Sequence, residues 1–309
     1  MTALATALAA LVPYAPAAGP AVDELDLSIV PARTPFLVHV DVEGLLGCTL
    51  AETLLSMEEV RDDMDLDQIR RELGIDPLED VLSVTAFSSG PQFAEAGAVV
   101  VRTTDALEGA IERFRAEGEL REGRLGDLTV YGLEDGMAYV HRAGDERLVV
   151  ISDDEDELAR AIDVVRGDAP SIATSGSASL RPEPKPGAFV LVEVGEAMTA
   201  LLEDHGEPAS RLGKLARRFS LQVGERGGDT LFVDAELEAS DLQGAQDVAN
   251  ILNGLKSLVS LAAGHEDVPQ LALDVLNDIR IEAAGTLVRL SIEMDSHALA
   301  DELSALEDD

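Results

Sequence analysis

Runs of strand-forming residues separated by only a few turn residues most constrain the fold of this chain. Residues Phe36 to Val42 alternate in character with the period of two that is typical of a β-strand. Val81 to Phe87 and Ala96 to Arg102 are two further runs, and the turn-forming Ser88 to Pro91 lies between them. Strands joined this closely pair antiparallel, because a parallel pair needs a long crossover. Antiparallel sheets with covering helices are therefore expected.

Helical and further strand patterns fill the rest of the first half. The apolar spacing predicts helices over residues 44–57, 66–73, 105–117 and 154–166. Gly74 and Pro77 are expected to end the second of these helices. Period-two runs predict strands over 128–133, 138–142 and 148–151.

The same order of patterns begins again after a proline-rich stretch. The run Val190 to Val194 repeats the spacing of Val38 to Val42, and the later strand-to-helix transitions recur in the same order. We therefore predict an α+β fold of two tandem related units, with antiparallel sheets and helices covering one face of each. The expected segments are a signal segment at 1–22, a first α+β unit at 23–168, a Pro/Ser-rich linker at 169–186 and a second α+β unit at 187–309.

The longest predicted helix lies in the second unit. It runs from Asp241 to Ala263, and its apolar stripe is widened by Ile251 and Leu258. We expect this helix to be buried on much of its surface.

Net charge excludes several classes of partner. The 309 residues include 60 acidic and 23 basic side chains, which gives a formal charge of −37. Such a surface repels phosphate backbones and anionic head groups, so no nucleic-acid partner is expected. The absence of Trp and the 3% aromatic content leave little material for base or sugar stacking. The partner is expected to be an unknown protein or small ligand.

The single cysteine also limits the chemistry. Cys48 cannot form an internal disulfide or a cysteine-based metal cluster, and it is expected to be a small buried side chain.

The uncharged N-terminus resembles a secretory signal. Residues 1–22 carry no charge, an Ala/Leu-rich run ends at Pro13, and Ala15 to Ala17 supply a small-x-small cleavage pattern. A periplasmic or secreted location follows, with a mature chain that begins near Asp23 and carries no membrane span. The alternative is an Ala/Pro-rich tail on a cytoplasmic protein.

Motifs that could carry chemistry are weak. The run Asp63-x-Asp65-x-Asp67 lacks the glycine and the final glutamate of a calcium loop. Five histidines lie singly along the chain, without the pair spacing of a zinc or iron site: His39, His141, His205, His265 and His297. No phosphate loop, dinucleotide fingerprint or nucleophile elbow is present. No catalytic, cofactor-binding or metal-ligating residue is assigned, and no cofactor is expected.

Acidic and basic clusters have structural interpretations. Ser152 with Glu155, and Ser240 with Gln243, have the spacing of capping boxes at helix starts. A basic group comprises Arg211, Lys214, Arg217 and Arg218, three of which would share one helix face. It could hold an anionic ligand, or it could pair with the protein's own surplus carboxylates.

Three segments resemble a group of uncharacterised exported bacterial proteins, of the type found in planctomycete-like and myxobacterial genomes. They are Phe36 to Leu46, Gly74 to Val81 and Ala98 to Arg102, and the likeness covers mainly residues 30–165. The resemblance implies an exported tandem α+β protein, and it brings no functional residues with it.

We expect a non-enzymatic exported scaffold that binds or organises a partner. One alternative is a hydrolase with a site assembled from scattered acids and His39, which shares a strand face with Asp41. Another is a carrier that encloses an apolar ligand between sheet and helices.

Salt should stabilise the chain. Repulsion at a charge of −37 opposes compaction, and raising ionic strength from about 0.01 M to about 1 M shortens the Debye length from ~30 Å to ~3 Å. The surplus of acids exceeds the number of helix starts at which acids are favourable. Thermal unfolding of the purified chain at the two salt concentrations should therefore show a higher midpoint in high salt. An unchanged or lower midpoint would mean that local ion pairs already compensate the carboxylates.

Overall fold

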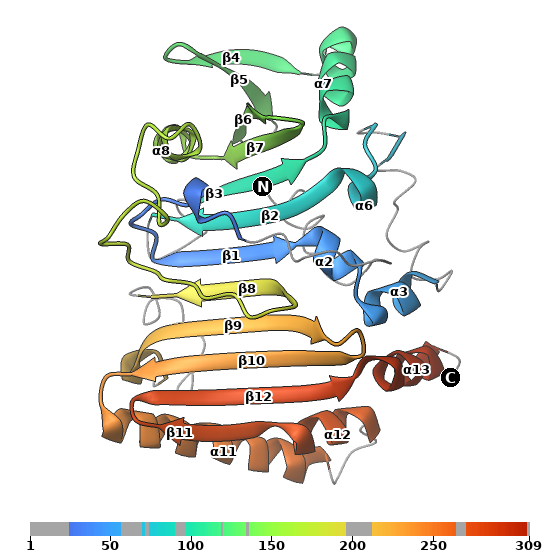
Figure 1. Ribbon diagram of the computed structural model, residues 1–309, viewed down its shortest axis with the longest axis vertical. Helices are drawn as coiled ribbons and strands as arrows, with labels where there is room; N and C mark the ends of the chain where they lie inside the picture. Colours follow the sequence, from blue (N-terminus) through green and yellow to red (C-terminus); the bar gives the residue numbers. More distant parts are fainter. Residues whose placement is uncertain are drawn as a thin grey trace. The chain divides into compact units, whose positions relative to one another are not determined.

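The chain divides into two compact units, Met1–Arg181 and Pro182–Asp309. The computed structural model describes residues 25–56, 70–71, 74–89, 97–118, 120–133, 136–195, 212–263 and 270–307. Both units combine helices with antiparallel strands (Figure 1), so the predicted α+β class is confirmed. The boundary between the units falls inside the proline-rich stretch.

The first unit contains an antiparallel sheet in the order β1-β2-β3-β7-β6-β5-β4. Its strands are β1 (Phe36–Asp41), β2 (Val81–Ser88), β3 (Gly97–Thr103), β4 (Arg121–Leu125), β5 (Leu128–Leu133), β6 (Gly136–Ala143) and β7 (Glu146–Ser152). Its helices are η1 (Leu27–Ile29), α2 (Val42–Leu46), α3 (Thr49–Ser56), α6 (Pro77–Asp80), α7 (Ala106–Glu117) and α8 (Glu155–Val165). Helix α8 packs on β3, β6 and β7. Its Leu158 and Ile162 are fully buried.

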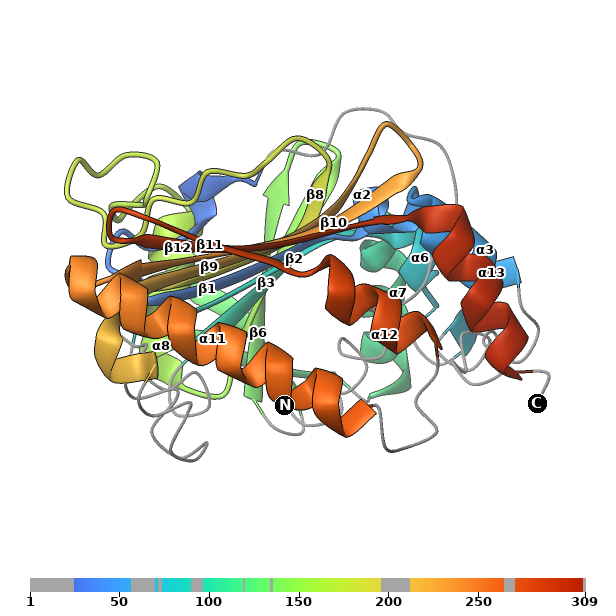
Figure 2. The same cartoon turned by 90° about the horizontal axis from the view of Figure 1, so that it is seen from below.

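The second unit contains an antiparallel sheet in the order β8-β9-β10-β12-β11. Its strands are β8 (Ala188–Val194), β9 (Ala216–Arg226), β10 (Thr230–Ala239), β11 (Arg280–Ala284) and β12 (Leu287–Asp295). Its helices are α11 (Leu242–Ala263), α12 (Gln270–Asp278) and α13 (Ser296–Glu307). Helices α11 and α12 lie on the same face of this sheet (Figure 2).

Corresponding strands hold corresponding places in the two orders. In each unit the first three strands are neighbours in chain order, and the strand before the last helix lies beside the third. The first unit adds the hairpin β4–β5. The duplication inferred from the sequence stays a prediction, and the shared strand order is consistent with it.

The proline-rich stretch is not a free linker along its whole length. Ile172 N–H donates to the Val30 carbonyl at 2.8 Å, and the Ser179 hydroxyl donates to the Thr34 carbonyl at 2.6 Å. Leu180 is buried. These contacts attach residues 171–180 to the first unit, because an ordered segment between compact bodies satisfies its backbone groups on one of them.

Two predicted helix caps are wrong by one or two residues. Asp154, not Ser152, caps α8 by accepting from Glu157 N–H at 2.8 Å. Ser152 is the last residue of β7, and its hydroxyl donates to the Gly97 carbonyl. Asp241, not Ser240, accepts from Gly244 N–H at 2.7 Å where α11 begins. In each case the residue directly before the helix provides the cap.

Two shorter elements also differ from the prediction. Pro77 begins α6, with Asp76 as its cap, whereas the sequence indicated only a helix end there. This follows from the preference of proline for the first helical position. Strand β4 was not predicted, because its residues are almost all exposed and show no apolar alternation.

Helix α11 is less buried than expected. Its first half buries Ala245, Val248 and Ala249, but its second half exposes a set of large apolar side chains. These are Leu255, Leu258, Val259 and Leu261. A helix of 22 residues is about 33 Å long. It packs on β11, β10 and β12, which have five, ten and nine residues.

Candidate functional site

The face of the second unit's sheet opposite α11 and α12 is rich in charge. Along β10, Leu231, Leu237 and Ala239 are buried on the helix side, whereas Asp234, Glu236 and Glu238 alternate with them. The register places their neighbours on the same face: Arg218, Ser220, Gln222 and Arg226 of β9, and Leu287, Arg289 and Glu293 of β12. We call this surface the polar face.

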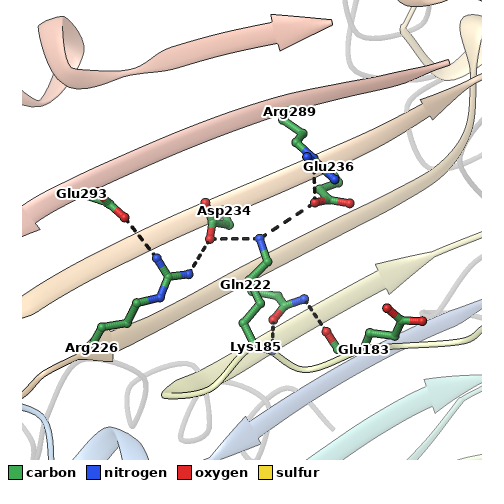
Figure 3. Close-up of polar contacts among 8 residues, drawn as sticks. All are labelled: Glu183, Lys185, Gln222, Arg226, Asp234, Glu236, Arg289 and Glu293. Carbon is green, nitrogen blue, oxygen red and sulfur yellow. Dashed lines mark hydrogen bonds and ion pairs between the residues drawn. The ribbon is translucent and has the colours of Figure 1, made fainter. Parts of the chain in front are cut away.

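Charges of opposite sign alternate across the polar face (Figure 3). Asp234 contacts Lys185 Nζ at 3.0 Å and Arg226 Nη2 at 2.9 Å through its Oδ2 atom. Arg226 also pairs with Glu293 at 3.1 Å, and its guanidinium lies 3.8 Å from the centroid of the Phe232 ring. Lys185 Nζ is 3.9 Å from Glu236 Oε1. The contacts form one network, in which a single exposed pair is worth at most about 1 kcal/mol.

Gln222 holds a segment of backbone on this face. Its side chain is buried, its Oε1 atom accepts from Lys185 N–H at 2.7 Å, and its Nε2 atom donates to the Glu183 carbonyl at 3.1 Å. Three prolines, Pro182, Pro184 and Pro186, surround these two residues and have no N–H to donate. The Gln222 amide thus satisfies one backbone N–H and one backbone carbonyl of this segment.

A hollow of about 190 Å³ lies between this segment and the strands. It is lined by Glu183, Lys185, Glu193, Arg218, Ser220, Gln222, Glu236, Glu238 and Leu287. Glu193 is only 1% exposed and pairs with Arg218 Nη2 at 2.9 Å. Within the part of the chain that the structure describes, the carboxylates of Glu183 and Glu238 have no ion-pair partner. Both carboxylates are exposed to solvent, so the hollow carries negative charge that water solvates.

The predicted helical stripe of basic residues is wrong. Arg217 and Arg218 lie in β9, which pairs with β10 from Ala216 onward, so they cannot share a helix face with Lys214. Arg211 lies outside the described residues. Arg218 pairs with the protein's own Glu193, which was the alternative interpretation of this group.

His39 and Asp41 share the buried face of β1, and both have structural partners. His39 Nδ1 is 2.9 Å from Thr85 Oγ1, while its Nε2 atom is buried without a hydrogen-bond partner. Burial, with a smaller contribution from the nearby charge of Arg102, lowers the pKa of His39 to about 4. Asp41 is 1% exposed and caps α2 by accepting from Gly44 N–H. A buried neutral imidazole is not displayed to an external substrate.

Several other predictions can be placed. Cys48 is buried, as expected. The signal segment at 1–22 and the run Asp63 to Asp67 lie outside the described residues. Among the described residues, no three His, Cys, Asp or Glu side chains converge closely enough to hold a metal ion. The described helices include none with the length and apolar character needed to cross a membrane.

Of the residues that line the hollow, Arg218 alone was singled out from the sequence, as part of the basic group. Lys185 is one of three lysines in the chain and stands in a proline-rich stretch, and Asp234, Glu236 and Glu238 recur with a period of two. These signals mark an acidic strand face and an isolated cation. The lysine and the acids come together only through pairing between segments that are far apart in the sequence, and local sequence patterns do not predict that pairing.

No family model and no curated protein sequence matches the chain. Among solved structures, crystal form I of TP0453 is 11% identical, with coverage of 92% of this chain and 99% of that chain and a TM-score of 0.42. Crystal form III of TP0453 is 12% identical, with coverage of 90% and 97% and a TM-score of 0.44. Likenesses at this level carry no argument about function.

The low pKa of His39 predicts a loss of stability in acid. Because its pKa is about 4 in the folded state and near 6.5 when unfolded, the unfolded chain takes up the proton first as pH falls. The loss begins near pH 6.5, is complete near pH 4 and amounts to about 3 kcal/mol at most. Urea unfolding across this window should show a smaller loss for His39→Asn than for the unsubstituted chain.

The exposed His297 provides the control for this comparison. His297→Asn should lose stability in parallel with the unsubstituted chain. Equal losses for His39→Asn and the unsubstituted chain would contradict the assignment to His39.

Proposed function

We propose that this chain is a non-enzymatic exported binding protein whose ligand site is the hollow on the polar face. The observation that carries the proposal is the pairing pattern in the hollow. Its cations, Lys185 and Arg218, already contact carboxylates of the protein, whereas Glu183 and Glu238 remain unpaired among the described residues. Both carboxylates are exposed in a concave surface, where a few polar groups can orient a ligand.

The hydrolase alternative has less support. Its named candidate, His39, is buried against Thr85, and Asp41 is used to cap a helix. General acid–base catalysis requires a group within hydrogen-bond reach of the substrate. Both side chains therefore have structural roles within the protein.

The carrier of an apolar ligand is also less favoured. Of the residues that line the hollow, Leu287 alone is apolar. An apolar ligand would desolvate the Glu183 and Glu238 carboxylates without replacing their hydrogen bonds to water, which is costly.

Filling the hollow tests the binding function without assuming the nature of the ligand. Ser220 lines the hollow from β9, so Ser220→Trp should occupy the space. Native mass spectrometry of the full chain purified from its producing cells should show a bound molecule that Ser220→Trp loses.

Thr230→Trp places the same side chain on the same face of the sheet, outside the hollow, and serves as the matched control. It should retain the bound molecule, and thermal unfolding should show that both variants fold. The same bound molecule in both variants, or none in the unsubstituted chain, would contradict the proposed site.

Export is tested separately. We expect a mature chain that starts near Asp23, because the uncharged small-residue segment before it has the composition of a signal core. Cell fractionation with intact-mass measurement should find the shortened chain outside the cytosol. A cytosolic chain that keeps Met1 would contradict export.

A further inference from the structure

We propose that the second half of α11 is a dimerisation surface, on which a second copy of this chain docks with the same half of its own α11. The proposal goes beyond the binding function, because the hollow lies on the opposite face of the sheet and stays open in such a dimer. Three observations carry it. They are an exposed apolar stripe, the absence of acids, and the internal hydrogen bonds of the polar side chains beside the stripe.

The apolar stripe consists of four large side chains, Leu255, Leu258, Val259 and Leu261, which are 38%, 64%, 55% and 64% exposed. Spacings of three and four residues place them beside one another on the helix. Val248, about three turns before Val259 and on the same side of the helix, is fully buried. The stripe therefore continues the side of α11 that packs on the strands, where the helix runs away from them (Figure 2).

This half of the helix brings no negative charge to a contact. Residues 248–263 contain no acid, although the whole chain has a formal charge of −37. Lys256 is their only charged residue, and its Nζ atom donates to the carbonyls of Asn277 and Ile279 at 3.2 Å and 2.7 Å. Association through acid-rich surfaces would bring like charges together and be opposed by their repulsion. A contact between two apolar stripes avoids this repulsion.

The polar side chains beside the stripe are satisfied within the helix. Asn253 Nδ2 donates to the Ala249 carbonyl at 2.8 Å, and the hydroxyls of Ser257 and Ser260 donate to carbonyls one turn earlier at 2.8 Å and 2.9 Å. These residues have no need of an external hydrogen-bond partner. An exposed apolar set with a polar rim is typical of a protein–protein contact.

A second copy supplies a surface that matches the stripe. The stripe lies on the outside of a helix, and the open groove beside it is lined mostly by polar residues, so neither encloses a small apolar ligand. Leu255, Leu258 and Leu261 recur at every third residue. Two such helices, antiparallel about a two-fold axis beside Leu258, bring Leu255 of each copy opposite Leu261 of the other.

The size of the stripe sets the expected strength. Four large side chains from each copy make a smaller interface than the about 1,600 Å² that is standard for a stable complex. We therefore expect a weak, reversible dimer.

Sedimentation velocity of the full chain from about 5 µM to about 500 µM, a range suited to a weak complex, tests the proposal. We expect a monomer–dimer equilibrium that shifts toward the dimer as the protein concentration rises. Salt at about 1 M should strengthen the dimer relative to about 0.1 M, because it screens the repulsion between two chains of charge −37. A monomer at every concentration, or a dimer that salt weakens, would overturn the proposal.

A charge placed in the stripe should disrupt the dimer. Leu258→Asp should weaken dimerisation at least about tenfold, because the contact would then bury one unpaired carboxylate from each copy. Leu242→Asp is the matched control, since Leu242 is 69% exposed at the start of the same helix and lies outside the stripe. It should leave dimerisation unchanged within about twofold. Both positions are exposed, so thermal unfolding should show that both variants fold. Equal weakening in the two variants would overturn the proposal.

A cross-link tests the geometry of the contact. Cys48 is buried, so Leu258→Cys introduces an exposed thiol next to the proposed two-fold axis. Oxidation should link two copies of this variant by a disulfide, whereas Leu242→Cys should stay largely unlinked. Equal linkage of the two variants would assign the cross-link to random collision and overturn the proposed geometry.

Discussion

Surplus negative charge governs how the basic side chains of this protein are used. Among the described residues, two of the three buried carboxylates pair with a cation: Glu193 with Arg218, and Glu157 with Arg160. Removing one partner would leave an uncompensated buried charge, which costs far more than an exposed pair contributes. Lys256 is used differently, since its Nζ atom donates to carbonyls at the end of α12. Basic groups that already have partners in the protein are not free to hold an anionic ligand. The charge of the hollow is therefore set by Glu183 and Glu238.

The polar face also depends on the period of a single strand. Because side chains of β10 alternate between faces, apolar residues such as Leu231 and Leu237 bury under α11, and the acids gather on the other side, where Phe232 is also buried. Neighbouring acids in such a row repel one another. Lys185 reduces that repulsion by standing between Asp234 and Glu236, and the Gln222 amide fixes the backbone that carries it. The proline-rich segment therefore contributes a positive charge to the polar face, in addition to connecting the two units.

Local patterns predicted most strands and helices, because alternation and helical spacing are properties of a few neighbouring residues. The prediction for β5, Leu128–Leu133, agrees in both bounds, and that for α11 agrees to one residue at its start. The burial of α11 was not predictable, because it depends on which parts of the helix contact other elements, here β10, β11 and β12. The hollow was missed for the same reason. Its walls come from β8, β9, β10, β12 and residues 183–185, and no local pattern encodes their meeting.

The two units satisfy a buried carboxylate of a strand in different ways, and the two side chains differ by one methylene group. Asp41 in β1 and Glu193 in β8 are each buried and each follow a half-exposed valine, Val40 or Val192. The shorter Asp41 reaches the backbone of the helix that follows and caps it through Gly44. Glu193 carries one more methylene and pairs with a side chain of the neighbouring strand, Arg218. A cap satisfies a carboxylate through local backbone, whereas an ion pair consumes a cation. The chain has few cations, and Arg218 is already paired with Glu193. Arg218 therefore does not neutralise another carboxylate of the hollow, and the net charge of the hollow stays negative.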